Sequence, residues 1–356
     1  MKNIAVIFGG ASVEHDVSVV TGLKICKALR RTYNILPIYF SLDSKFYYLK
    51  GVNFSDYQDK EKLVNLGKRI EFINGSVYIW AGKKLKEYIK IEHAINCCHG
   101  GAGENGELSA YLKINKVPCS SSSMNCVICA NKYALKQFAK GLDIPVNESV
   151  LITNSNLDEK LEYIKNNFHK DLVIKPNTLG SSIGIIKTSF SNLKENIELL
   201  LHLDNQLIVE DYISNVEELH CAIVVNKSSV CLSQIEKIVL KNDIFSFEDK
   251  YINKVSTREI PAKIPDKIKV QVYDICKKLH ENLNFVGVVE MQFFYVKNTD
   301  ELYLNEVNVV PKNLCFKLFE GLGINAKMMG EYLTSSKEHI KKQTYFDSDV
   351  LYKIDL

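Results

Sequence analysis

Short apolar runs alternate with amphipathic stretches along the first third of the chain. The runs NIAVIFGG, YNILPIYF and HAINCC have the length of buried strands, and residues 18–31 follow the first run with a helical pattern. Glycine-rich turns, GGASVEHDVS and HGGAGENGE, come where two of these strands end. The alternation predicts a parallel, doubly wound α/β sheet in the N-terminal part, and small ligands bind at the strand ends of such sheets.

The rest of the chain mixes paired strands with helices. A helix is predicted over residues 131–141, followed by the strands KDLVIKP and QLIVEDYI. ELHCAIVVN and SSVCLSQIEKI have the pattern of a hairpin around Asn226 and Lys227. After an amphipathic helix at residues 268–283, FVGVVEMQFFYV and LYLNEVNVV form two strands joined by the polar turn KNTDE. This order predicts an α+β C-terminal half.

Length and composition narrow the class of protein. The chain has 356 residues, which predicts two or three domains, and 46% hydrophobic with 24% charged residues is typical of a soluble globular protein. A net charge of +3 gives no electrostatic argument for binding nucleic acid, and no apolar run has the length of a membrane span. The N-terminus lacks the sections of a signal peptide, so we expect a cytoplasmic protein with reduced thiols.

The ten cysteines include one CxxC pair, Cys126 and Cys129. No second CxxC or histidine pair completes a zinc site. Packing inside a helix or turn is the favoured interpretation, and a metal or redox role is the alternative.

Polar residues interrupt the last apolar strand at Glu306 and Asn308. These side chains are two positions apart, so in a strand both project from the same face. Antiparallel pairing across the KNTDE turn would bring Gln292 close to Glu306. Ligands that are all oxygen suit Mg²⁺ that bridges nucleotide phosphates. The alternative is a polar pair that caps the end of the strand.

Two further segments have features of a nucleotide site. In KPNTLGSSIGI, Lys175 ends a strand before a loop of Gly and Ser whose amides and hydroxyls can close over phosphate. In VEDYISNVEE, strand-end backbone can pair with a purine edge and a carboxylate can hold ribose hydroxyls. The alternatives are a surface glycine loop beside a solvated lysine and a solvated acidic turn.

Taken together, these segments resemble the D-alanine–D-alanine ligases of the ATP-grasp superfamily. The similarity runs in order through VIFGGASVEHDVS, HGGAGENGELSAYL, VPCSSSS, KPNTLGSSIGI, KY and LNEVNVVP, over nearly the whole chain. It implies a Rossmann-like N-terminal domain at residues 1–120, followed by a two-lobed ATP-grasp fold. The lobes would be a small central domain at 121–208 and a C-terminal domain at 209–356, with ATP gripped between them.

The resemblance also implies a role for each matching residue. For the nucleotide these are Lys132 and Lys175 at the phosphates with Ser182 beside them, Lys250 near the terminal phosphate, Glu210 at the adenine and Glu218 at the ribose. The magnesium ligands would be Glu306 and Asn308, with Gln292 as the third oxygen. Glu14 would orient the amine of the first D-alanine, with Ser181 and Tyr251 in the same hydrogen-bonded group and His99 near that substrate.

Departures from the family pattern lie in the acceptor half of the site. Glu290 and Gln292 stand where the family carries Arg-x-Asp, and the arginine normally stabilises the oxyanion of the tetrahedral intermediate. Lys312 replaces a glycine, and Lys317 replaces the serine that holds the second substrate's carboxylate. A carboxylate beside phosphate needs a cationic neighbour. We therefore expect Glu290 and Lys317 to face one cavity, with Lys317, Lys312 or Arg258 pairing with Glu290.

Two functions follow. The first is an ATP- and Mg²⁺-dependent ligase that joins a carboxylate to an amine, either D-alanine–D-alanine ligase or a relative with another acceptor. The second is a nucleotide-binding paralogue that no longer ligates and acts in regulation or assembly. The expected partner is a small amino-acid-like substrate, with neither nucleic acid nor membrane, and a homodimer is left open.

Overall fold

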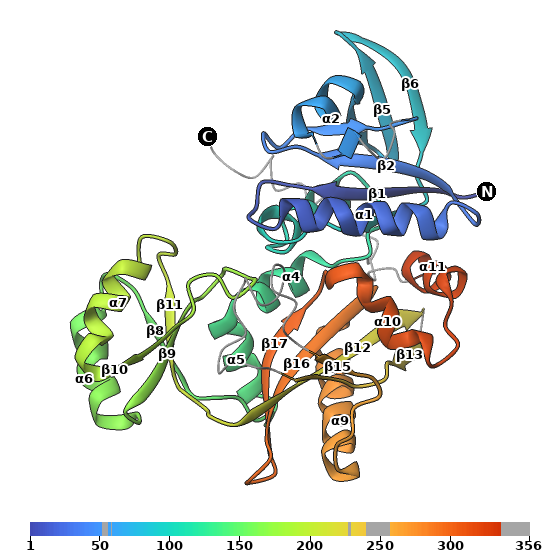
Figure 1. Cartoon of the computed structure of the whole chain (residues 1–356). Helices are drawn as coiled ribbons and strands as arrows, with labels where there is room; N and C mark the ends of the chain where they lie inside the picture. The colour runs from blue at the N-terminus through green and yellow to red at the C-terminus, as the bar shows by residue number, and fades with distance from the viewer. Residues whose placement is uncertain (52–55, 58, 227–228, 240–256, 336–356) are drawn as a thin grey trace, which may run out of the picture.

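The computed structural model contains three β-sheets with helices packed against them (Figure 1). It describes residues 1–51, 56–57, 59–226, 229–239 and 257–335. The strands of each sheet come from one continuous part of the chain, so the three sheets follow one another in sequence. The sequence-predicted domain boundaries, after residues 120 and 208, stay predictions.

The N-terminal sheet is mixed rather than fully parallel. Strand β1 pairs in parallel with β2 and β7, but β2, β3, β4, β5 and β6 pair antiparallel. The prediction of a parallel, doubly wound sheet was therefore wrong for strands β3 to β6, which join the sheet by antiparallel pairing. The reason is that connections such as residues 74–75 and 82–83 are too short to cross over a sheet face. The elements are β1 (Asn3–Gly9), α1 (His15–Leu29), β2 (Asn34–Phe40), β3 (Phe46–Tyr48), α2 (Lys60–Leu66), β4 (Lys68–Ile73), β5 (Ser76–Ala81), β6 (Lys84–Lys90), β7 (His93–Asn96) and α3 (Glu107–Ile114).

The central sheet has the order β10-β9-β11-β8, with antiparallel neighbours. Helices α6 and α7 cover one face (Figure 1), where Ile174 and Val209 join an apolar core. Because side chains alternate along a strand, Lys175 and Glu210 project from the opposite face. The elements are β8 (Ser149–Ile152), α6 (Leu157–Asn167), β9 (Asp171–Pro176), β10 (Ile186–Ser189), α7 (Leu193–Leu200) and β11 (Leu207–Asp211).

The C-terminal sheet has the order β15-β14-β12-β16-β17, and β13 also pairs with β12. Two predictions are confirmed: Asn226 pairs with Ser229 in a hairpin, and Gln292 lies opposite Glu306 in the antiparallel pair β16–β17. Helix α9 packs on one face of this sheet. The elements are β12 (Val216–Asn226), β13 (Ser229–Leu232), β14 (Glu236–Val239), β15 (Thr257–Glu259), α9 (Asp266–Leu283), β16 (Val288–Val296), β17 (Glu301–Asn308), α10 (Phe316–Glu320) and α11 (Ala326–Ser335).

Two apolar cores connect parts of the chain that are distant in sequence. Helices α4 (Ser123–Ala130) and α5 (Lys132–Lys140) pack on the C-terminal sheet, where Cys126 and Cys129 are buried free thiols. Elsewhere, strand β1 and helix α1 share a core with β16 and α10. This second core packs the N-terminal sheet against the C-terminal sheet.

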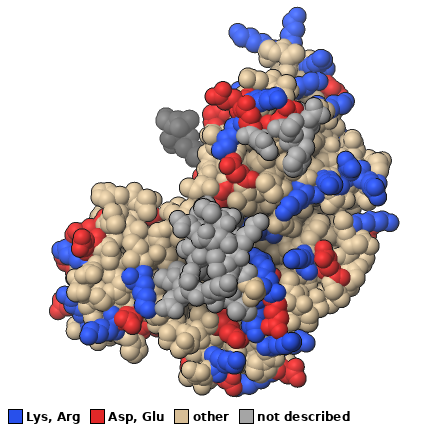
Figure 2. Space-filling model, in the orientation of Figure 1, with Lys and Arg blue, Asp and Glu red and all other residues tan. Residues whose placement is uncertain are grey.

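The surface carries both signs of charge. In the view of Figure 2, Lys and Arg gather at the far end of the β5–β6 hairpin, while acidic and basic side chains are interspersed elsewhere. Within the part of the chain that the structure describes, every helix is too short or too polar to span a membrane.

Candidate functional site

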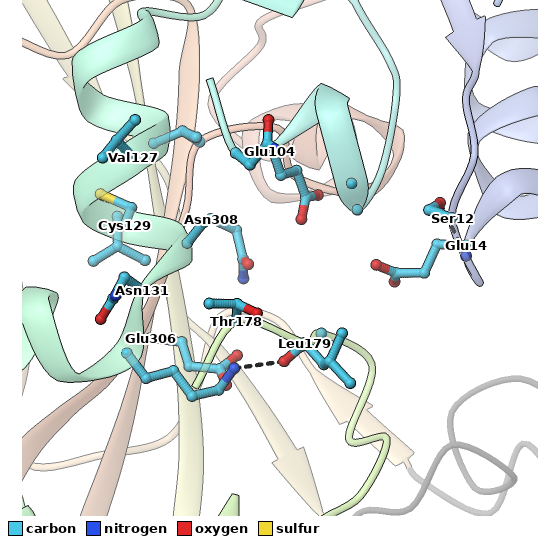
Figure 3. A pocket seen from close by; sticks show the side chains of 18 of the residues that line it. Ser12, Glu14, Glu104, Val127, Cys129, Asn131, Thr178, Leu179, Glu306 and Asn308 are labelled. Atoms are coloured by element: carbon cyan, nitrogen blue, oxygen red, sulfur yellow. Dashed lines mark hydrogen bonds and ion pairs between the residues drawn. The ribbon is translucent and has the colours of Figure 1, made fainter. Parts of the chain in front are cut away.

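A cavity of about 490 Å³ lies where the three sheets meet. Its walls come from the turn after β1, residues 100–105, helices α4 and α5, the loop at residues 178–180 and the end of β17. Figure 3 shows Glu14 on one side of the cavity, Glu104 from a second wall, and Glu306 and Asn308 across from Glu14. Three carboxylates therefore line one cavity.

A glycine turn places Glu14 at this cavity. Gly9 ends β1 with φ +102°, and a Cβ atom there would lie 2.3 Å from the carbonyl oxygen of Phe40. Only glycine fits, because the φ value is strained for other residues and the neighbouring atom is backbone. The chain then enters α1 directly after Glu14, whose side chain is only 5% exposed.

Glu14 is already held by two groups of the chain itself. Lys312 Nζ lies 3.3 Å from Glu14 Oε1, and the Ser181 hydroxyl donates to the same oxygen. Lys312 Nζ also lies 3.4 Å from Ser181 Oγ. Burial alone would raise the pKa of Glu14, but the charge of Lys312 and the Ser181 hydrogen bond outweigh it and lower the pKa. Glu14 is thus an ionised carboxylate with an internal cation against it.

His99 is buried behind this group rather than in the cavity wall. One ring nitrogen, Nδ1, lies 3.0 Å from the carbonyl oxygen of Val310 and 3.6 Å from Glu104 Oε1, while Nε2 lies 3.0 Å from Thr21 Oγ1. The Ser12 hydroxyl donates to the carbonyl of His99 at 2.6 Å. His99 therefore ties the turn after β7 to α1 and to the segment after β17.

Lys132 and Glu306 stand together on the opposite wall. Lys132 is the first residue of α5 and donates to the Leu179 carbonyl at 2.6 Å, the contact drawn in Figure 3. Its Nζ also lies 3.7 Å from Glu306 Oε1. This ammonium connects the loop after β9 with the C-terminal sheet, and it is positioned where an anionic ligand in the cavity could reach it.

Lys175 belongs to a buried charge triad. Its Nζ lies 2.9 Å from Glu210 Oε2, and Lys136 Nζ lies 3.0 Å from Glu210 Oε1. Burial alone would raise the pKa of Glu210, but the two lysines lower it to about 2. Sequence reasoning missed Lys136, although its position one helical turn after Lys132 puts both side chains on one face of α5.

A second buried cluster lies on the face of the C-terminal sheet opposite α9. His220 Nε2 lies 2.8 Å from Glu218 Oε1, and Nδ1 lies 3.3 Å from Glu290 Oε1 and 3.9 Å from Glu236 Oε2. Burial alone would lower the pKa of His220, but the charge of Glu290 and the hydrogen bond to Glu218 raise it to about 10. Burial alone would raise the pKa of Glu290, but His220 lowers it to about 2. An imidazolium among carboxylates is the result.

The expected partner of Glu290 was wrong. Lys317 is exposed, Lys312 pairs with Glu14, and Arg258 pairs with Glu236 at 3.1 Å, whereas Glu290 pairs with His220. The reason is strand register: His220 lies directly opposite Gln292 in the β12–β16 pair, so it shares a sheet face with Glu290. Loop lysines cannot compete with a cation already placed on that face.

Both amides of the predicted magnesium set turn their nitrogen toward Glu290. Gln292 Nε2 donates to Glu290 Oε2 at 3.0 Å, and Asn308 Nδ2 donates to the same oxygen at 3.3 Å. Their oxygens are therefore the atoms that a cation would meet, together with the Glu306 carboxylate. Within the described residues, no group of three or more His, Cys, Asp or Glu is placed to hold a metal. The donor set fits a hard ion that also draws oxygen from a ligand.

Comparison with known proteins decides the family. The family model described as "D-ala D-ala ligase N-terminus" matches residues 3–122, and "D-ala D-ala ligase C-terminus" matches residues 138–325. The chain belongs to the D-alanine–D-alanine ligase family. It is thus an ATP-dependent ligase resembling D-alanine–D-alanine ligase, of the class that forms a C–N bond, and the resemblance drawn from the motifs is confirmed.

Relatives match over almost their whole length. A D-alanine–D-alanine ligase of Thermosipho melanesiensis is 29% identical, covering 99% of this chain and 98% of its own. Its counterpart in Thermosipho africanus is 30% identical, and the match covers 91% of this chain and 89% of that protein. Two solved structures share the fold. The Helicobacter pylori D-alanine–D-alanine ligase has a TM-score of 0.77 and 24% identity, and the match covers 96% of this chain and 100% of that one. The VanG D-Ala:D-Ser ligase of Enterococcus faecalis has a TM-score of 0.79 and 23% identity, and the match covers 93% of this chain and 98% of that one. The predicted ATP-grasp architecture is confirmed.

The remaining predicted residues of this family member divide into two groups. Lys250 and Tyr251 lie outside the described residues. Ser181 and Ser182, in the loop after β9, both have left-handed backbone, with φ 54° and 59°. Such values are sterically costly for residues other than glycine and concentrate at functional sites.

Proposed function

We propose that this chain uses ATP and Mg²⁺ to activate a small carboxylic acid as an acyl phosphate and then joins it to an amine other than D-alanine. One observation carries the proposal. Glu14, Lys132, Glu306 and Asn308 come from separate elements and line one cavity at the junction of the three sheets. A carboxylate for orienting a substrate thereby faces groups suited to phosphate and metal.

The nucleotide would lie between the central and C-terminal sheets. Lys132 and Lys175 would neutralise phosphate charge, because each ammonium is held in place by a carboxylate or carbonyl from a neighbouring element. Glu210 would contact the adenine and Glu218 the ribose. In the structure Glu210 holds Lys175 and Lys136, so it would also orient the phosphate-binding lysine.

Glu306, Asn308 and Gln292 would hold the magnesium ion. The ion would supply charge neutralisation at the phosphates during phosphoryl transfer. Gln292 offers an oxygen without the charge that an aspartate would add. The neighbouring Glu290 carboxylate is bound by the nitrogens of Gln292 and Asn308, so it orients their amide oxygens.

The acceptor half is the part that departs from the family. Glu290 carries a buried negative charge where the family pattern has an arginine, and His220 rather than a loop lysine balances it. A carboxylate there disfavours negative charge that develops on an attacked carbonyl. This same observation favours the second candidate, a nucleotide-binding paralogue that no longer ligates. The three-domain division and a cytoplasmic location are further predictions, and a homodimer is left open.

A phosphate-release assay with ATP, Mg²⁺ and a panel of D- and L-amino acids tests the proposal. Phosphate release that depends on a donor and an acceptor other than D-alanine supports it. Efficient formation of D-alanyl-D-alanine would instead assign the ordinary family activity. Nucleotide binding without phosphate release for any pair of substrates would favour the paralogue.

A further inference from the structure

The ammonium of Lys312 contacts Glu14, the acid that is expected to bind the substrate's amine. The two residues come from opposite ends of the chain: Glu14 precedes α1, and Lys312 follows β17. Their 3.3 Å contact is shared with Ser181 from the loop after β9, so three separate parts of the structure meet at one carboxylate oxygen. The cation expected from a ligand is here part of the chain.

The other oxygen of Glu14 lies close to two glycines. A Cβ atom on Gly180 would lie 3.1 Å from Glu14 Oε2, and one on Gly100 would lie 3.4 Å from it. The absence of a side chain at both glycines thus leaves room beside Oε2, although the whole Glu14 side chain is only 5% exposed. A second cation at Glu14 would share this carboxylate with Lys312 and Ser181, which already bind Oε1.

The backbone around Lys312 has an unusual conformation. Asn313, Leu314 and Cys315 form a left-handed turn, with φ 50°, 48° and 51°. Such a run is retained only where the surroundings determine it. Here Leu314 and Cys315 are buried, and Lys24 Nζ donates to Asn313 Oδ1 at 3.0 Å. The turn fixes the backbone next to Lys312, and from there the side chain reaches Glu14.

Charge then determines what this part of the site accepts. Two ammonium groups beside one carboxylate repel each other, and the 40% exposure of the Lys312 side chain means that water screens part of this repulsion. A hydroxyl carries no charge and can donate to Glu14 or accept from Lys312. The subsite therefore discriminates against a cationic substituent and accepts a neutral one.

We propose that Lys312 determines donor specificity, so that the acid activated in this site carries a neutral group, such as a hydroxyl, in place of an ammonium next to its carboxyl. The inference rests on the proposed function, because it assumes that Glu14 faces the donor. In the activation step a donor carboxylate oxygen attacks the γ-phosphorus of ATP. The bond from that phosphorus to the β–γ bridging oxygen breaks, which yields the acyl phosphate and ADP.

Trapping the acyl phosphate with hydroxylamine tests the inference without using the acceptor half. The hydroxylamine nitrogen attacks the acyl carbon, the bond to the phosphate oxygen breaks, and a hydroxamate and phosphate are released. The donors to compare are D-lactate and D-alanine. We expect kcat/KM to favour D-lactate at least tenfold in the unaltered chain. Lys312→Met should reverse the preference, and Lys312→Arg should retain it.

Lys327→Met is the matched control, because Lys327 is exposed on helix α11 and has no assigned role in the site. It should leave the donor preference unchanged. A preference for D-alanine in the unaltered chain would overturn the inference, and so would an equal donor ratio in the unaltered chain and Lys312→Met. In either case hydroxamate formation would leave the proposed function standing.

A binding measurement covers the case in which no hydroxamate forms. Each acid is added with Mg²⁺ and a non-hydrolysable ATP analogue, and the melting temperature is recorded. A larger stabilisation by D-lactate, reversed in Lys312→Met, supports the inference. Equal stabilisation, none from either acid, or more from D-alanine overturns it. Failure of the proposed function is recognised separately, by the absence of any shift with the nucleotide analogue and Mg²⁺.

Discussion

Glu290 illustrates how one residue depends on neighbours that are far away in sequence. Its carboxylate is bound by His220 from β12, Gln292 from β16 and Asn308 from β17. Of these three partners, Gln292 alone lies on the same strand as Glu290. A buried charge of this kind persists because both of its oxygens have a cationic or hydrogen-bonding partner.

Replacing His220 tests that dependence. His220→Gln removes the cation and leaves Glu290, Glu218 and Glu236 facing one another. Breaking a buried ion pair costs about 3–5 kcal/mol, so we expect a large loss in the free energy of unfolding in denaturant titrations. His169→Gln is the control, because the exposed His169–Asp211 pair, with His169 90% exposed, should matter little. Equal stability of the two variants would contradict the cluster's assigned importance.

The same pair predicts a pH profile. The pKa of His220 is raised from 6.5 to about 10, so its contribution to stability is complete below pH 6.5 and is lost as the pH rises through 10. The pKa of Glu290 is lowered from 4.5 to about 2, so its contribution is complete above pH 4.5 and is lost as the pH falls through 2. The stability difference between the unaltered chain and His220→Gln should peak between these limits and shrink on both sides. A pH-independent difference would exclude the ion pair as its cause.

Lys175 gives the corresponding test of nucleotide binding. Lys175→Ala removes a charge-assisted contact, which contributes about 1.5–3 kcal/mol, so the affinity for Mg-ATP should fall roughly ten- to hundredfold. Calorimetric titration measures it. Lys194→Ala, at an exposed pair with Asp158, should bind as the unaltered chain does. Unchanged affinity in Lys175→Ala would remove this lysine from the phosphate site.

At the scale of elements, the turn from β1 to α1 controls where Glu14 lies. Gly9→Ala would combine a strained φ of +102° with a Cβ atom 2.3 Å from backbone. We expect a loss of roughly 3 kcal/mol or more in unfolding free energy. Gly51→Ala separates the two causes, because Gly51 has φ +74° but no heavy atom of the described residues lies within 4 Å of the added Cβ. That variant should lose only about 1 kcal/mol. Similar losses for both would show that the close approach to Phe40 is unimportant.

At the scale of the whole molecule, the cavity depends on all three sheets together. Its walls come from segments as distant as residues 11 and 309, and the core shared by β1, α1, β16 and α10 packs the N-terminal sheet against the C-terminal sheet. A ligand in this cavity would contact several sheets at once. It should therefore stabilise the molecule as a unit rather than one part of it.

A thermal shift with Mg-ATP checks that expectation. A ligand present at 100 times its dissociation constant stabilises the native state by about 2.7 kcal/mol. The melting temperature should rise with millimolar Mg-ATP, and should rise less when EDTA removes the metal. Mg²⁺ without nucleotide is the control. The absence of any shift at millimolar Mg-ATP would count against a nucleotide site.

The sequence by itself determined the elements and the family of this protein. Periodicity located the helix at 268–283 and the hairpin of β16 and β17, because each rests on a local pattern that the chain must satisfy wherever it packs. Gln292 was placed opposite Glu306 for the same reason, since a short turn sets the register of its own two strands. Motif order then identified the ligase family.

The tertiary structure alone decided which charges meet. Lys312 reaches Glu14, His220 reaches Glu290, and Lys136 reaches Glu210, across sequence separations from which no pattern could foresee a contact. Pairing between strands that are not joined by a short turn, and packing between sheets, are set by the burial of whole apolar faces. The ionic contacts at the site are consequences of that burial, and through Lys312 they also determine which substrate we expect the site to accept.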